Sequence, residues 1–150
     1  MKKYEFTGEV KVKFGVTFKR IRALIDFGNV KKGELGGFIE KEENLSYAGN
    51  AWVYGDAEVY GNAEVSGNAE VYSNADYMVI GIIGSRFGFT TFFKNKNNKI
   101  SVSCGCFLGT LAEFRESVKE KHGTDTKFAK VYQAAADLAE LQIGHNEKAD

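Results

Sequence analysis

Residues 49–78 read GNAWVY GDAEVY GNAEVS GNAEVY SNADYM, a six-residue unit repeated five times without a gap. The third position of every unit is alanine, and the fifth is valine in the first four units. Residues two apart on an extended chain point to the same side, so the alanine and valine of one unit face inward together. The Gly-Asn or Gly-Asp pair between units supplies the positive φ that a corner requires. A chain that turns a corner every six residues is predicted to coil into a β-solenoid.

Three units are expected to close one triangular coil, so residues eighteen apart stack on one another. Tyr54 is then predicted to lie against Tyr72. The glutamates at the fourth position of three units fall on three different faces, which argues against a catalytic carboxylate cluster. The irregular segment GELGGFIEKEENLS, just before the repeats, keeps apolar residues at the same spacing. It is expected to form an atypical first coil that caps the solenoid.

The first thirty residues have the pattern of strands. Every second residue from Val10 to Phe18 is apolar, the period of a half-buried strand. Gly15 is expected to break this run into a hairpin or a bulge. Arg20 and Arg22 alternate with apolar residues, and we expect them on a solvated strand face. Strands and repeats together are predicted to form one domain, residues 1–78.

Residues 79–150 are predicted to form a separate small α+β domain with the element order β-β-β-α-α. The runs YMVIGII, FTTFF and KISVSC supply the three strands. Thr110 followed by Glu113 is a capping box, and Gly123 is expected to end the helix that begins there. A second helix is predicted from about Thr126 to Leu141. The predicted fold class is therefore α+β, with a β-solenoid between N-terminal strands and a C-terminal unit.

The composition excludes some classes of function. Twenty basic and twenty acidic residues cancel, which removes the bulk electrostatic reason for nonspecific binding to nucleic acid or membranes. The lysines at positions 94, 96 and 99 are a weak nucleic-acid signal, because no recognised module surrounds them. The sequence has no apolar run of transmembrane length, and the Met-Lys-Lys start lacks an apolar signal core. We expect a cytoplasmic protein.

The repeats resemble the hexapeptide repeats of left-handed β-helices, and the left hand is implied by that resemblance alone. A second likeness covers the whole chain. The motifs GxLGGFIEKExNLS, IGSR and CGCFLGTLAEF look like those of a family of small proteins encoded by bacteriophages and prophages. This resemblance implies a phage-borne accessory protein in the cytoplasm of a bacterial host. Some small phage proteins inhibit host defence systems, CRISPR nucleases among them.

Two cysteines and two histidines lie in the C-terminal part of the chain. Cys104, Cys106 and His122, with His145 as a fourth ligand, are candidates for a tetrahedral zinc site. The CxC spacing matches the usual zinc knuckle poorly, and the strand alternation places Cys104 in the core as a small hydrophobe. Both interpretations stay open at this point, and no other cofactor is expected.

The turn Gly84-Ser85-Arg86 also has two interpretations. A glycine-rich turn with an arginine can hold a phosphate through backbone N–H groups and the guanidinium. It can equally be a hairpin loop with an exposed arginine, which the absence of phosphate-loop spacing favours.

The function we predict first is a non-enzymatic interaction protein, with a host protein as its partner. Open solenoid ends need covering, either by the terminal segments or by another copy, and a homo-oligomer is expected. The residues predicted for the binding surface are Arg86, Phe87, Lys94, Lys96, and, on the solenoid exterior, Trp52 and Tyr54. The alternative is an oligomer that sequesters a small ligand, such as a nucleotide signal, with Arg86 and Ser85. A hexapeptide acyltransferase is disfavoured, because no histidine lies within or before the repeats.

Overall fold

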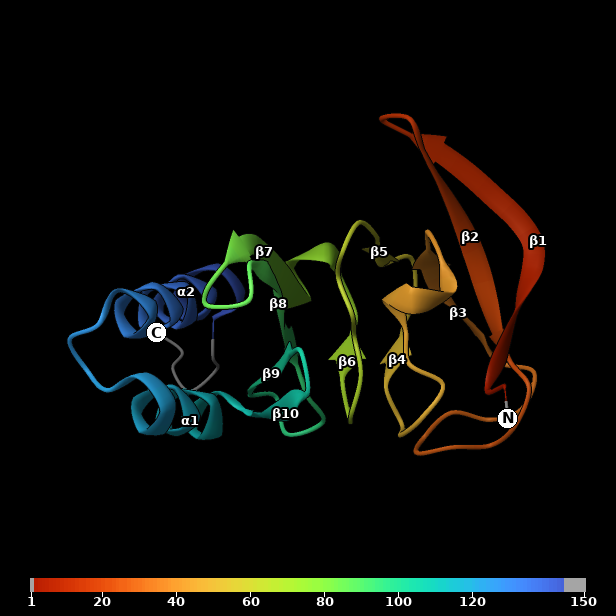
Figure 1. Ribbon diagram of the computed structural model, residues 1–150. Coiled ribbons are helices and arrows are strands. Elements are labelled where there is room, and N and C mark those ends of the chain that lie inside the picture. Colours follow the sequence, from red (N-terminus) through yellow and green to blue (C-terminus); the bar gives the residue numbers. More distant parts are fainter. Residues whose placement is uncertain (1, 145–150) are drawn as a thin grey trace.

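A computed structural model describes residues 2–144 and has an α+β fold. Figure 1 shows its parts in a row: two helices, a four-stranded antiparallel sheet, the repeats, and a second sheet at the N-terminal end. The predicted fold class is confirmed at this level. Neither α-helix within residues 2–144 has the length and apolar character needed to cross a membrane.

The N-terminal sheet has the strand order β1-β2-β3-β5. Its strands are β1 (Tyr4–Lys13), β2 (Val16–Ala23), β3 (Leu35–Ile39) and β5 (Glu58–Val59). Strands β1 and β2 form the expected hairpin, with Phe14 and Gly15 as its two turn residues, both at positive φ. This is the backbone geometry that favours a tight hairpin turn. Strand β3 pairs antiparallel with β2 and parallel with β5, which joins the hairpin to the repeats.

The expectation of one half-buried apolar stripe on this hairpin is wrong. Val12 pairs with Thr17, and Lys11 pairs with Phe18, so the apolar positions of the two strands lie on opposite faces. Val10 and Val12 are more than half exposed, whereas Phe18 is buried. The reason is the two-residue turn: it opposes even-numbered residues of β1 to odd-numbered residues of β2. The lysines of β1 therefore share the face of Phe18.

These lysines surround a buried carboxylate. The Nζ atoms of Lys11 and Lys13 lie 2.6 and 3.0 Å from the carboxylate oxygens of Glu58, which is 5% exposed. The side-chain amide of Asn74 donates a third hydrogen bond, at 3.1 Å. Burial alone would raise the pKa of Glu58, but the three hydrogen bonds outweigh it and lower the pKa to about 2. The cluster ties the hairpin to the repeats.

This cluster predicts a loss of stability in acid. Because the pKa of Glu58 is lowered from 4.5 to about 2 on folding, its contribution is complete above pH 4.5 and is lost as the pH falls towards 2. We expect Glu58→Gln to lower the free energy of unfolding by about 2 kcal/mol at pH 7 and by much less at pH 2.5. Urea unfolding of both proteins across this range measures it. A difference that does not change with pH contradicts the assignment.

The two arginines of β2 behave differently from each other. Arg22 pairs with Glu5 at 2.8 Å and is about half exposed, as expected for a solvated face. Arg20 is mostly covered: its guanidinium lies 2.9 Å from carboxylate oxygens of both Glu9 and Asp56, and it also lies over the ring of Phe38. The expectation of a solvated face is therefore wrong for Arg20, which joins the hairpin to the repeats.

The repeats form short parallel strand pairs. Strands β4 (Trp52–Val53) and β6 (Glu70–Val71) pair eighteen residues apart, as the six-residue unit predicts. Tyr54 stacks on Tyr72 with ring centroids 4.3 Å apart, which confirms that prediction. The alanines and valines of the first four units are buried, at positions 51, 53, 57, 59, 63, 65, 69 and 71. Each of the strands β4, β5 and β6 has only two residues. The repeats therefore form short strand pairs within separate small sheets, and not one continuous solenoid sheet.

Two parts of the repeat prediction are wrong. The fifth unit does not continue the short parallel strands: Asn74–Asp76 form a 3-10 helix, and only its last two residues belong to a strand, the start of β7. The Ser73 hydroxyl accepts the N–H of Ala75, and the Asp76 carboxylate accepts those of Tyr72 and Ser73. Trp52 is not on the exterior but fully buried, and it contacts aromatic rings from the segment before the repeats, those of Tyr4 and Phe27.

The sheet that follows has the strand order β10-β9-β8-β7. Its strands are β7 (Tyr77–Ile83), β8 (Gly88–Lys94), β9 (Ile100–Cys104) and β10 (Phe107–Thr110), and the helices are α1 (Leu111–His122) and α2 (Lys127–Ile143). The fourth strand is an addition to the predicted order. Thr110 and Glu113 form the expected capping box, and Gly123 ends α1 at positive φ, so both predictions are confirmed. The second helix begins after Thr126 as expected and continues two residues beyond Leu141.

The flanking sheets cover both ends of the repeats. Phe93 on β8 belongs to the apolar core of the repeats, while the adjacent Phe92 belongs to the core under the helices. At the other end, the buried Lys3 donates to the carbonyl of Ala51 at 2.8 Å, and the Tyr4 hydroxyl donates to that of Leu45. Within residues 2–144, segments of the chain itself therefore pack against both ends of the repeats.

Candidate functional site

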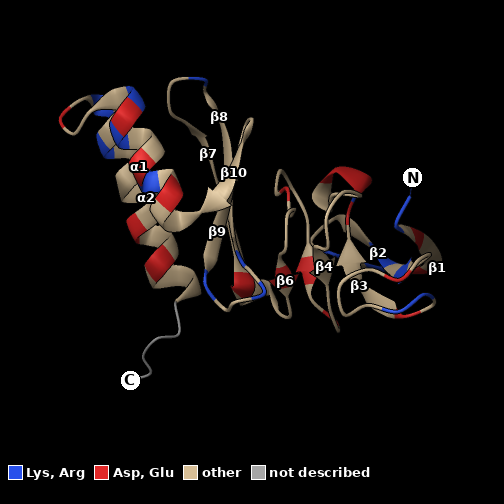
Figure 2. Cartoon of the chain, turned by 90° about the horizontal axis from the view of Figure 1, so that it is seen from below, with Lys and Arg blue, Asp and Glu red and all other residues tan. Residues whose placement is uncertain are grey.

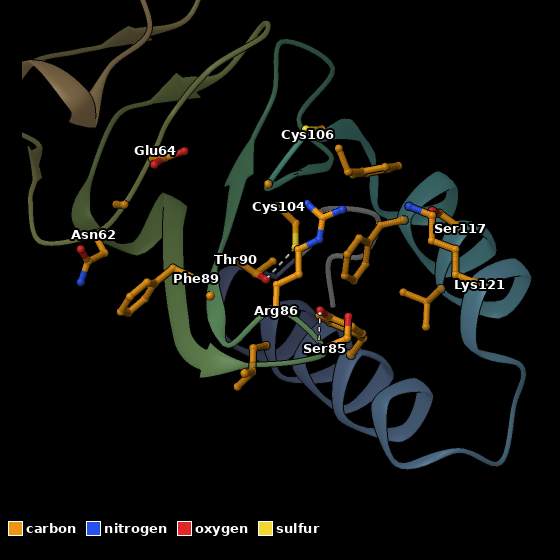
Figure 3. Close-up of a pocket in the computed structure, with 18 of the residues that line it drawn as sticks. Asn62, Glu64, Ser85, Arg86, Phe89, Thr90, Cys104, Cys106, Ser117 and Lys121 are labelled. Carbon is orange, nitrogen blue, oxygen red and sulfur yellow. Dashed lines mark hydrogen bonds between the residues drawn. The ribbon is translucent and has the colours of Figure 1, made fainter.

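A cavity of about 590 Å³ lies between the repeats, the β7–β8 turn, the β9–β10 turn and helix α1. Figure 3 shows Arg86 in its middle, with Asn62, Glu64 and Phe89 on one side and Ser117 and Lys121 on the other. Cavities of this size hold small organic ligands in many proteins. We therefore take this cavity as the candidate site.

The back of the cavity is aromatic and rigid. The ring of Tyr132 on α2 stacks against His122 at 5.7 Å and meets Phe114 edge-on at 5.9 Å. The Tyr132 hydroxyl accepts the backbone N–H of Ser85 at 3.2 Å, which attaches the β7–β8 turn to α2. A Cβ atom at Gly84 would lie 1.9 Å from this hydroxyl, so only glycine fits there. The turn that carries Arg86 is thus held in place by α2.

The end of the cavity next to α1 is cationic. Arg86 comes from the β7–β8 turn, and Lys121 comes from the last turn of α1. The acidic side chains among the described lining residues, Glu43 and Glu64, come from the segment before the repeats and from the repeats. Within residues 2–144, Arg86 makes no ion pair. Its guanidinium lies next to Gly105: a Cβ atom on that glycine would be 3.5 Å from one of the Nη atoms. A small anion at this end would meet uncompensated positive charge.

The molecule as a whole has no such bias. Figure 2 shows acidic and basic residues interspersed on the helices and on the N-terminal hairpin. The formal net charge of the chain is zero. The charge asymmetry is therefore a local property of the cavity.

The predicted zinc ligands share this cavity but do not form a ligand set. Among residues 2–144, no three His, Cys, Asp or Glu side chains are grouped closely enough to hold a metal ion. The Thr90 hydroxyl contacts the Cys104 sulfur at 3.2 Å, Cys106 is exposed, and His122 stacks on Tyr132. His145, the proposed fourth ligand, lies outside the described residues. The described cysteines and His122 thus act here as lining groups.

The four binding residues predicted on the C-terminal unit do not lie together, and the two predicted on the solenoid exterior are covered or half-covered. Arg86 and Phe87 are together on the β7–β8 turn, and Phe87 is 74% exposed. Lys94 ends β8, about 20 Å further along the strand, and its ammonium lies 3.6 Å from Asp76. Lys96 is exposed in the next turn, next to the repeats, where its N–H donates to the carbonyl of Asn68. Of the remaining two, Trp52 is buried and Tyr54 is half-buried against Tyr72.

Several lining residues were not predicted from the sequence. Lys121 and Ser117 look like the solvated face of a helix, and Asn62 and Glu64 look like ordinary members of the repeat. Their only signal is that they converge in space from elements distant in the chain.

A scan against protein-family models finds no family that matches this chain, and a search of curated proteins finds no significant relative. The functional argument therefore rests on the residues of the cavity.

Proposed function

We propose that this chain is a non-enzymatic binding protein that takes up a small anionic molecule of the nucleotide class. The observation that carries the proposal is the cationic end of the cavity, where Arg86 and Lys121 lie beside apolar walls. Guanidinium groups bind phosphate oxygens through two parallel hydrogen bonds, and an ammonium adds charge without fixing direction. Aromatic and aliphatic walls suit a flat organic body.

Removing the central cation tests this proposal. We expect Arg86→Ala to weaken the binding of nucleoside monophosphates at least tenfold, because a charged hydrogen-bond donor is worth about 1.5–3 kcal/mol. Titration calorimetry with GMP, AMP and CMP measures the dissociation constants. Lys96→Ala is the matched control, since it removes one exposed cation far from the cavity and should leave binding unchanged. If no monophosphate binds the parent protein, or both variants bind alike, the proposal fails.

The second candidate function is binding to a host protein, a role expected from the phage context that the resemblance implies. Its support is the end of β7 and the β7–β8 turn, where Ile82 and Phe87 are 65% and 74% exposed. Exposed aromatic and arginine side chains dominate interface energies. The partner we infer is a bacterial defence protein, such as a CRISPR nuclease, with an apolar hollow and an acidic rim. Purified candidate nucleases should lose binding to Phe87→Asp but keep it with Phe14→Asp, which changes another exposed phenylalanine at positive φ, on the hairpin.

We further propose that the parallel strand pairs are successive coils of a short β-solenoid, with the left hand that the resemblance implies. Backbone hydrogen bonds support stacked coils: the N–H groups of Asn50, Trp52 and Tyr54 donate to carbonyls seventeen residues onward. Self-association also stays a proposal, and sedimentation equilibrium is its test.

A further inference from the structure

The end of the cavity next to the repeats differs chemically from the end next to α1. Glu64 and Asn62 lie there with the ring of Phe89, as Figure 3 shows. The Glu64 backbone N–H donates to the Thr91 hydroxyl at 3.0 Å, which fixes that residue against β8. Lys41 and Glu43 also line the cavity. The Glu64 carboxylate is an acceptor at the same end of the cavity as the Phe89 ring.

A ligand that spans the cavity must match both ends. Its anionic group belongs at Arg86 and Lys121, since a carboxylate repels it at the other end. Its far end should be flat enough to stack on Phe89 and should donate hydrogen bonds to Glu64. Stacking of a base on an aromatic side chain is sequence-tolerant, so the carboxylate has to supply the discrimination.

Among the common bases, guanine alone presents two adjacent donors, N1–H and the N2 amino group, which fit the two oxygens of one carboxylate. Adenine and cytosine each place an acceptor next to their amino group, and uracil places acceptors on both sides of its N–H. A base that turns an acceptor towards Glu64 leaves a repulsive contact, which penalises it strongly. The side-chain amide of Asn62 can donate to the O6 and N7 acceptors of guanine.

We propose that the cavity selects guanine nucleotides, with the base between Phe89 and Glu64 and the phosphate at Arg86 and Lys121. This inference rests on the proposed nucleotide-binding function and adds the identity of the base. It assigns Glu64 as the residue that determines specificity.

The test compares GMP, IMP and AMP by titration calorimetry on the parent protein, Glu64→Gln and Arg86→Ala. IMP is the matched ligand, since it lacks only the N2 amino group of GMP. We expect GMP to bind about tenfold more tightly than IMP and more tightly still than AMP. Glu64→Gln should bring the three affinities within about threefold of one another. Because losing a negative charge strengthens the binding of every anion, the ratio of affinities is the readout.

Equal affinities for GMP and AMP, all weakened by Arg86→Ala, would overturn guanine selection and leave the proposed function standing. A preference for GMP that survives Glu64→Gln would overturn the role of Glu64. If none of the three nucleotides binds the parent protein, both proposals are wrong. Far-ultraviolet circular dichroism of each variant checks that it is folded, and neither substituted side chain is buried.

Discussion

Asn44→Asp is expected to destabilise the protein by about 4 kcal/mol at pH 7, although it only replaces the NH2 of the side-chain amide by an oxygen of similar size. The Asn44 side chain is fully buried and all of its hydrogen-bonding groups are used. Its Oδ1 accepts the backbone N–H groups of Glu40 and Lys41, and its Nδ2 donates to the carbonyls of Gly61 and Ala63, at 3.2 and 2.9 Å. A carboxylate oxygen in place of Nδ2 would face both carbonyls with negative charge.

The pH dependence separates this charge effect from a loss of packing. Burial beside two carbonyls should raise the pKa of an aspartate at position 44, so the folded state takes up a proton that the unfolded state releases. The difference in unfolding free energy from the parent should therefore shrink as the pH falls from 7.5 to 5. Asn97→Asp, the same change at an exposed position, should stay within about 0.5 kcal/mol of the parent. Urea unfolding of the two variants measures this, and equal effects would contradict the assigned role.

The repeats could be predicted because their signal is redundant. Four units carry the same small and β-branched residues, and the period alone gives the eighteen-residue offset of β4 and β6. The failure of the fifth unit has a local cause that the sequence contains. Serine replaces glycine at position 73, and Asp76 follows three residues later, a pattern that caps a helical turn. That pattern competed with the repeat and determined the local structure.

The hairpin itself was predicted, but the prediction of one apolar face failed, because a single alternating pattern does not continue through a turn. Alternation identifies faces only within one strand, and a two-residue turn reverses which parity faces inward. The lysines at positions 11 and 13 look solvated from the sequence, yet they lie on the covered face, because Glu58 arrives there from the repeats. Trp52 is a similar case: residues from the N-terminal segment cover a position that the repeat alone makes external.

The cavity was largely beyond sequence analysis. The sequence predicts Arg86 and Ser85, on the β7–β8 turn, as possible ligands of a nucleotide, and both residues line the cavity. The opposite wall comes from α1, whose residues Ser117 and Lys121 belong to no motif. Convergence of residues some thirty positions apart depends on how α1 packs on the sheet, and no local pattern encodes that. The sequence suggests Cys104 and Cys106 as metal ligands, whereas the charged groups of the cavity are other lining residues, such as Arg86 and Lys121.

Gly49→Ala is the second substitution with a large expected effect, because it acts on the contact between repeat units eighteen residues apart. Gly49 has φ +73°, and a Cβ atom there would lie 2.7 Å from the carbonyl oxygen of Gly67. That carbonyl also accepts the N–H of Asn50, so it cannot turn away without losing a hydrogen bond. We expect the strained φ to cost about 1 kcal/mol and the clash about 2 kcal/mol more.

Gly55→Ala provides the matched control for the coil contact. Gly55 occupies the same position of the next repeat unit, with φ +59°, but a Cβ atom there would meet no atom within 4 Å. It should therefore carry only the backbone cost, about 1 kcal/mol. Thermal and urea unfolding of the two variants give the difference between them, which isolates the contact between residues 49 and 67. The proposed short β-solenoid requires Gly49→Ala to be clearly the more damaging, since only there would the new side chain meet a residue eighteen positions onward. Equal losses would mean that residues 49 and 67 are not held together, and the eighteen-residue stacking would be wrong.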